Sequence, residues 1–235
     1  MPRTKNQHRL TGLPSGVKKQ QKSGAGENRQ KLTLGGRVDE IAEDDRDLSA
    51  VPEDFVRVLH SLREARLRPE VFLEEVPAPG RIAPFSVALT GEVRPQRGAV
   101  PSELASGRFV VLYDPAGQEA WEGTLRVVTL LRASVEDELA ADPLLSHVAW
   151  TWLEDALEES EVHVRALGGT VTRVISDTFG VLVERPGEVE LELRASWTPL
   201  DLELGKHLEA WGTLLCTGAG LPPLPDGVTP LQPRR

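Results

Sequence analysis

The sequence predicts an α+β fold in which helices pack on one face of a largely antiparallel sheet. Residues 188–197 alternate apolar and polar side chains, which is typical of a strand with one buried and one solvated face. Asp114-Pro115-Ala116-Gly117 predicts a turn that joins two extended segments into a hairpin. The predicted strands come in runs instead of alternating singly with helices, which favours α+β over a doubly wound sheet.

The first predicted helix begins at Pro52, since proline suits the first helical position, and it ends at Arg68, whose helical geometry is disfavoured by Pro69. Four extended segments follow, at 71–76, 83–93, 108–114 and 120–133. In the last of them, period-2 alternation predicts one common face. Its members are Trp121, Gly123, Leu125, Val127, Thr129 and Leu131.

The second half of the chain begins with Ser134 to Asp137, which resembles a capping box for a short helix. Asp142-Pro143 then predicts the start of a helix to about residue 159. Its predicted buried stripe is Leu145, Val148, Ala149, Trp152 and Ala156. Strands follow at 162–166, 170–177 and 188–197, and a last helix begins near Asp201. The predicted order is helix, four strands, two helices, three strands, helix.

Charge divides the chain into three predicted parts. Residues 1–31 hold eight of the 27 Lys and Arg residues and one of the 36 acidic residues, although the whole chain carries a net charge of −9. We therefore predict a disordered basic tail and acidic linker over 1–50, because this part lacks an apolar face to bury. A single α+β domain is predicted over 51–225, with a C-terminal tail over 226–235.

Composition and motifs exclude several classes of protein. No apolar run is long enough for a membrane span, and the basic N-terminus does not resemble a secretory signal. Cys216 is the one cysteine, so no internal disulfide forms and a cytoplasmic location is expected. We expect no metal and no cofactor, because no phosphate loop or nucleotide fingerprint is present and the histidines lack ligand spacing. The histidines are His8, His60, His147, His163 and His207.

Two polar groups are the candidate functional surface. The first surrounds the hairpin turn, where polar residues also have an ordinary structural role. The second lies within a predicted strand, where a solvated face is the simpler explanation. With the arginine of the intervening strand, the candidates are Asp114, Gln118, Glu119, Arg126, Thr172, Arg173, Ser176 and Asp177.

Several segments resemble a known family. They are the hairpin block 113–133, RPEVFLEEVPAPGRIAP at 68–84, DPLLSHVAWTWL at 142–153, GTVTRVISDTFG at 169–180, ELRASWTP at 192–199 and HLEAWGTLLCTGAGLPP at 207–223. Together they are similar to the actinobacterial domain-of-unknown-function family 3000, over roughly Pro52 to Pro225. The resemblance implies an uncharacterised cytoplasmic protein and names no activity.

Three functions remain open from the sequence. The first is a non-enzymatic binding or regulatory module that presents a sheet face or edge to an unidentified protein partner. The second is an enzyme with a site built from dispersed residues, which requires a deep polar pocket in the folded chain. The third is nucleic-acid association through the basic tail, which the acidic body opposes. No membrane partner is expected.

Overall fold

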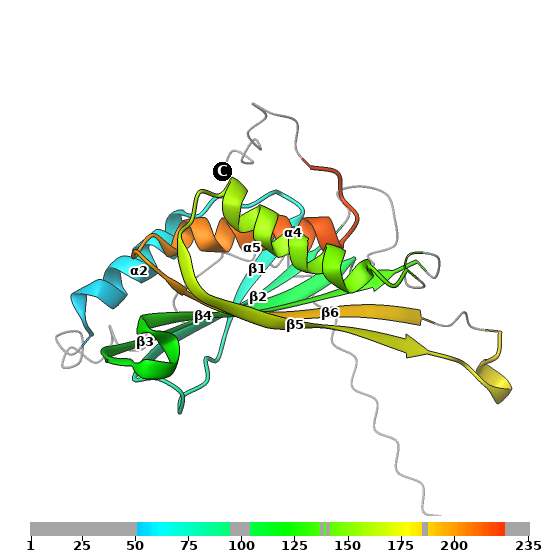
Figure 1. Cartoon of the computed structure of the whole chain (residues 1–235), viewed down its shortest axis with the longest axis horizontal. Helices are drawn as coiled ribbons and strands as arrows, with labels where there is room; N and C mark the ends of the chain where they lie inside the picture. Colours follow the sequence, from blue (N-terminus) through cyan, green and yellow to red (C-terminus); the bar gives the residue numbers. More distant parts are fainter. Residues whose placement is uncertain (1–50, 95–103, 137–138, 140–141, 185–187, 224–235) are drawn as a thin grey trace, which may run out of the picture. The chain divides into compact units, whose positions relative to one another are not determined.

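The computed structural model describes residues 51–94, 104–136, 139, 142–184 and 188–223, all within one compact unit that spans 32–235. In this part of the chain, three helices cover one face of a six-stranded antiparallel sheet (Figure 1). The predicted α+β class is therefore confirmed. The predicted tails at 1–50 and 226–235 lie outside the described residues, and the domain boundaries stay a prediction.

The elements follow the predicted order broadly. The helices are α2 (Glu53–Glu64), α4 (Leu145–Glu159) and α5 (Leu204–Gly218). The strands are β1 (Val71–Val76), β2 (Phe85–Val93), β3 (Ala105–Gln118), β4 (Gly123–Val135), β5 (Val164–Ser176) and β6 (Glu188–Pro199). Two short 3-10 turns, η2 (Glu119–Trp121) and η3 (Gly180–Leu182), follow β3 and β5. The strand order is β1-β2-β3-β4-β6-β5, which leaves β1 and β5 as the two edges.

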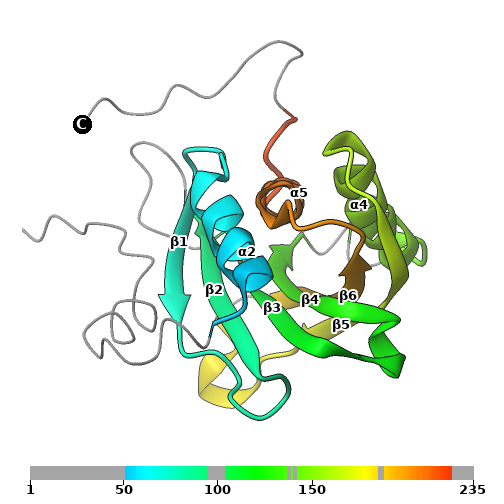
Figure 2. The same cartoon turned by 90° about the vertical axis from the view of Figure 1, so that its left-hand side faces the viewer.

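The main core lies between the sheet and the helices. Figure 2 shows α5 in the middle of this layer, with α2 toward β1 and α4 toward β5. Trp211 of α5 lies over Gly91 and Gly107, which face each other in register on β2 and β3. A Cβ atom on either glycine would come within 2.9 Å of the indole, so both positions require glycine for this packing.

The opposite face of the sheet is mostly uncovered in the described residues. One end carries a small second cluster, in which Trp121 packs with Ala88, Val110 and Leu112. The prediction that Trp121 continues the core face of β4 is therefore wrong. Trp121 belongs to η2, and this extra turn reverses its direction, whereas Leu125, Val127 and Leu131 reach the main core as predicted.

Other sequence predictions need local correction. Ser134 continues β4 instead of starting a helix, and much of the predicted short helix lies outside the described residues. Val148 is exposed, because the buried stripe of α4 is Leu145, Ala149, Leu153, Ala156 and Leu157. The predicted strands 162–166 and 170–177 form one strand, β5. It has a bulge between Arg165 and Gly168 and then continues through Gly169.

Candidate functional site

The eight residues predicted as a functional surface lie in three separate places. Asp114 and Gln118 flank a tight turn inside the end of β3, where its register with β4 shifts, so the predicted joining turn at 114–117 is a bulge and η2 makes the connection to β4. Gln118 donates to the Asp114 carboxylate at 3.1 Å, and that carboxylate accepts from the Ala116 backbone at 3.0 Å. Glu119 lies exposed in η2. Because these bonds close the turn, Asp114 and Gln118 have a structural role.

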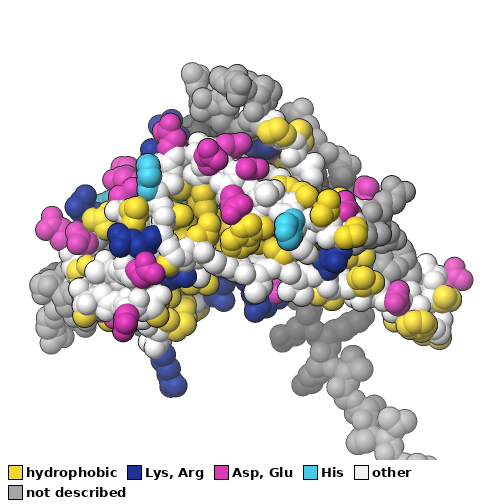
Figure 3. Space-filling model, viewed as in Figure 1, with side chains coloured by type: hydrophobic (Ala, Val, Ile, Leu, Met, Phe, Trp, Pro, Cys, Tyr) yellow, Lys and Arg dark blue, Asp and Glu magenta, His cyan; other side chains and the backbone are white. Residues whose placement is uncertain are grey.

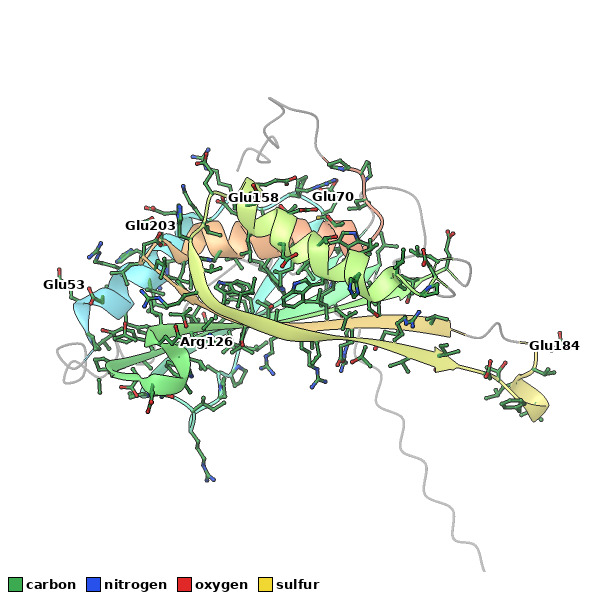
Figure 4. All side chains as sticks on the ribbon, viewed as in Figure 1. Glu53, Glu70, Arg126, Glu158, Glu184 and Glu203 are labelled. Carbon is green, nitrogen blue, oxygen red and sulfur yellow. The ribbon has the colours of Figure 1, made fainter. Side chains whose placement is uncertain are left out.

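Arg126 lies on the uncovered face of β4 and is half-buried (Figure 4). Its guanidinium donates to the Ala166 carbonyl at 3.0 Å and to the hydroxyls of Thr198 at 3.1 Å and Ser196 at 2.7 Å. Burial lowers the pKa of Arg126, and the negative charge of Glu122 opposes that shift. Its bonds tie β4 to β6 and to the bulge of β5, so Arg126 holds this corner of the sheet together.

The remaining four candidates lie on β5 or directly after it. Thr172 shares the uncovered face with Glu192, while Arg173 pairs with Leu191 on the helix face and donates to the Asp142 carbonyl at 3.0 Å. Ser176 ends the strand, and Asp177 follows it. This arrangement alternates the side chains between the two faces, so the four residues do not converge on one point.

A shallow hollow of about 540 Å³ occupies the middle of the uncovered face. Val110, Val128 and Leu130 form much of its floor, and Arg108 and Arg194 contribute to its lining. Arg194 already donates to the Glu192 carboxylate at 2.6 Å, and this bond is the main reason that the pKa of Glu192 is lowered. None of the eight predicted residues lines the hollow, which is mainly apolar.

A different surface is concentrated around β5. Of the thirteen large apolar side chains exposed in the described residues, eight lie on β5, on the segment after it or at the start of α4. We call them the β5 patch: Leu144, Val148, Val174, Ile175, Phe179, Val181, Leu182 and Val183. Val181 is 98% exposed and Phe179 is 79% exposed. These exposed apolar residues are clustered along the chain, whereas an ordinary surface carries such residues singly.

The last four members of the β5 patch lie in residues 177–184, which we call the arm. The arm projects beyond the helical layer, with Glu184 at its far end (Figure 4). Figure 3 shows apolar side chains at its tip and over the region of α4 and β5. None of these residues belongs to the predicted functional surface. The available signal was the apolar run from Phe179 to Val183 outside any predicted strand or helix.

The backbone of β5 forms the second part of this surface. β5 is 13 residues long, is the last strand of the sheet and pairs only with β6 in the described residues. Ala166, with φ of 49°, marks the bulge near its beginning. The regular stretch from Thr170 to Ser176 therefore presents an edge to which a further strand can add.

Two residues with chemical potential are buried in the core. The Trp197 indole donates to His207 Nδ1 at 3.1 Å, and His207 Nε2 has no hydrogen-bond partner in the described structure. Burial lowers the pKa of His207 to about 4, so the imidazole is neutral near pH 7. Burial raises the pKa of the Cys216 thiol to about 11, which disfavours the reactive thiolate.

Comparison with known proteins gives a family and no function. The described residues contain no cluster of three or more potential metal ligands, and no described helix is long and apolar enough to cross a membrane. No curated protein and no solved structure matches the chain. The family described as "Protein of unknown function (DUF3000)" matches residues 51–229, which is most of the chain. The chain therefore belongs to that family, as its sequence motifs predict.

Proposed function

We propose that the protein is a non-enzymatic binding module that contacts a protein partner through the edge of β5 and the arm. The observation that carries this proposal is the concentration of eight exposed apolar side chains on β5, on the arm and at the start of α4, beside a sheet edge that is unpaired in the described residues. An added strand would satisfy the backbone groups of β5, and the β5 patch would supply the apolar contact area. The cytoplasmic location expected from the sequence belongs to this proposal.

The enzyme alternative has less support. An enzyme built from the dispersed candidates requires a pocket that gathers them, whereas they lie in three places and the hollow is shallow. Asp114, Gln118 and Arg126 have structural partners in the turn and the sheet. The nucleic-acid alternative rests on the tail, which lies outside the described residues.

Affinity purification with matched variants tests the proposal. Tagged protein would be expressed in its own host and recovered with whatever binds it, including any untagged copy of the same chain. Phe179→Asp combined with Val181→Asp replaces the two most exposed apolar side chains of the arm by charged ones. Because both residues are exposed, the fold should persist. Phe72→Asp is the control, because Phe72 is an exposed apolar residue on the opposite edge, β1.

We expect at least one protein to be retained by the wild type and by the control but lost from the arm variant. Circular dichroism and thermal melting would establish that all three forms are equally folded. If no protein is retained by the wild type, or if the same proteins are retained by the arm variant, the proposed function is wrong.

A further inference from the structure

We propose that the strand which adds to β5 is β5 of a second copy, so that two chains form one continuous twelve-stranded antiparallel sheet. This inference rests on the proposed function, because it uses the same surface. A two-fold axis that runs perpendicular to the sheet keeps the helix faces of both chains on the same side of the joined sheet. Even-numbered residues of β5 then lie opposite even-numbered residues of the copy, and odd-numbered residues opposite odd-numbered ones.

The sequence of β5 restricts the position of the axis. With the axis at Arg173, two guanidinium groups would lie directly opposite each other, which is destabilising. With the axis at Thr172, the two threonines face each other, Thr170 faces Val174 of the copy, and no like charges are opposed. Threonine pairs across strands are favourable, so we place the axis at Thr172.

The helix face of the sheet agrees with this register. Ile175 of the copy would lie opposite Gly169, on which Trp150 of α4 already packs. Trp150 is half-buried and Ile175 is 67% exposed, so both would gain apolar contact. The bond from Arg173 to Asp142 places the start of α4 beside the axis, and Leu144 and Val148 are exposed there.

Charge also favours a second copy at this place. The acidic residues of α4 lie at its C-terminal end, and Glu158 is fourteen residues after Leu144, roughly 20 Å along a helix. Figure 4 shows Glu158 above the sheet near the middle of the view, well away from the arm residue Glu184 at the right-hand end. Leu144 and Val148 thus lie near the axis and Glu158 lies away from it, which limits repulsion from that end of α4. Glu154 lies closer to the contact, because its carboxylate accepts from the Trp150 indole at 2.8 Å.

The length of β5 and the arm is in the range that a specific dimer uses. A standard interface buries about 800 Å² on each partner and involves about 20–30 residues. The segment from Val164 to Val183 contributes twenty residues, and the start of α4 adds more. In this register, the arm of one chain extends toward Arg165 of the other, because residues that follow Thr172 oppose residues that precede it.

The test combines mass and crosslinking on the full-length protein. Light scattering after size exclusion should give the dimer mass at micromolar concentration. Ile175→Asp should raise the dimer dissociation constant at least tenfold, and Phe72→Asp should leave it unchanged. Thr172→Cys should form a disulfide-linked dimer on mild oxidation, since Cα atoms directly opposite in antiparallel strands are about 4.5–5.5 Å apart.

Thr170→Cys is the matched crosslinking control, on the same strand and face. In the proposed register it lies opposite Val174 of the copy, so it should not crosslink to itself. The native Cys216 is buried and gives little background. A protein that is monomeric up to about 100 μM would overturn the inference. So would a dimer whose dissociation constant is unchanged by Ile175→Asp and which Thr172→Cys does not crosslink. A monomer that still retains another protein through the arm would leave the proposed function standing.

Discussion

The two edges of the sheet differ in how they meet solvent. β1 has six residues, including Glu74 and Glu75, and it lies between Pro69 and Pro77. Its exposed Phe72 is covered by the Arg94 guanidinium, 5.0 Å from the ring centre. Short length, charge and flanking proline all discourage the addition of a further strand. The β1 edge is therefore protected against association.

The β5 edge has few of these protections. It is 13 residues long, contains no proline and no acidic residue, and is followed by the apolar arm. Its bulge interrupts only the beginning of the strand. Because the described part of the sheet protects one edge and leaves the other unpaired, the difference supports the proposed contact surface at β5. The predictions below test whether the two sides of the molecule differ as described.

The largest expected effect comes from the core beside β5. Trp197 of β6 is fully buried, so Trp197→Ala should lower the free energy of unfolding by about 3–5 kcal/mol. Denaturant titration measures the loss. Because β5 pairs only with β6 among the described strands, hydrogen exchange should show β5 losing protection before β1 does. Equal loss at both edges would contradict a separate β5 side.

Acid should weaken the same side through His207. Its pKa is about 4 when folded and 6.5 in an ordinary setting, so the unfolded chain binds a proton over this range while the folded chain does not. The unfolding free energy that depends on an uncharged His207 is fully present above pH 6.5. It is lost as the pH falls toward 4, by about 3 kcal/mol in all. His207→Gln should flatten the profile of unfolding free energy between pH 6.5 and 5. An unchanged profile would show that another group is responsible.

Neighbouring glycines in β5 should respond with opposite signs. A Cβ atom at Gly169 would lie 2.1 Å from the Arg194 carbonyl oxygen and 2.8 Å from Trp150, whereas nothing lies within 4 Å of one at Gly168. Gly169→Ala should therefore cost about 1–3 kcal/mol of unfolding free energy. Gly168→Ala should be neutral or stabilising by about 0.4–1 kcal/mol, because it restricts the unfolded chain. Equal effects would mean that Trp150 does not hold β5 in place.

These glycines also show where sequence reasoning reaches its limit. β1 was predicted with its observed bounds, because its pattern and its flanking prolines are local signals. Residues 167–169, which include Gly168 and Gly169, in contrast stand between two predicted strands, at 162–166 and 170–177, although the structure has one strand there. The strand continues because both glycines pair with β6, and the space beside Gly169 is taken by the Arg194 carbonyl of β6 and by Trp150 of α4. Both neighbours lie about twenty or more residues away in the chain.

The candidate site was less predictable than the fold. Asp114 and Arg126 were selected because they are polar, but their structural partners lie within the turn and on neighbouring strands. The β5 patch was missed because exposure depends on what covers a residue, which a local pattern does not record. Val148 illustrates the difference, since its helical spacing fits the buried stripe although α4 turns it toward solvent.

The smallest expected effect comes from removing the basic tail. Deletion of residues 1–36 should change the melting temperature by less than about 2 °C, because this segment has no apolar periodicity with which to stabilise the domain. The dimer mass should also be unchanged if the β5 edge is covered by a second copy and not by the tail. A tail that binds nucleic acid would instead show affinity that disappears on deletion and falls steeply with salt. A full-length monomer whose melting temperature falls by several degrees on deletion, and which then dimerises, would assign the cover of β5 to the tail and would remove the main contrast between the two edges.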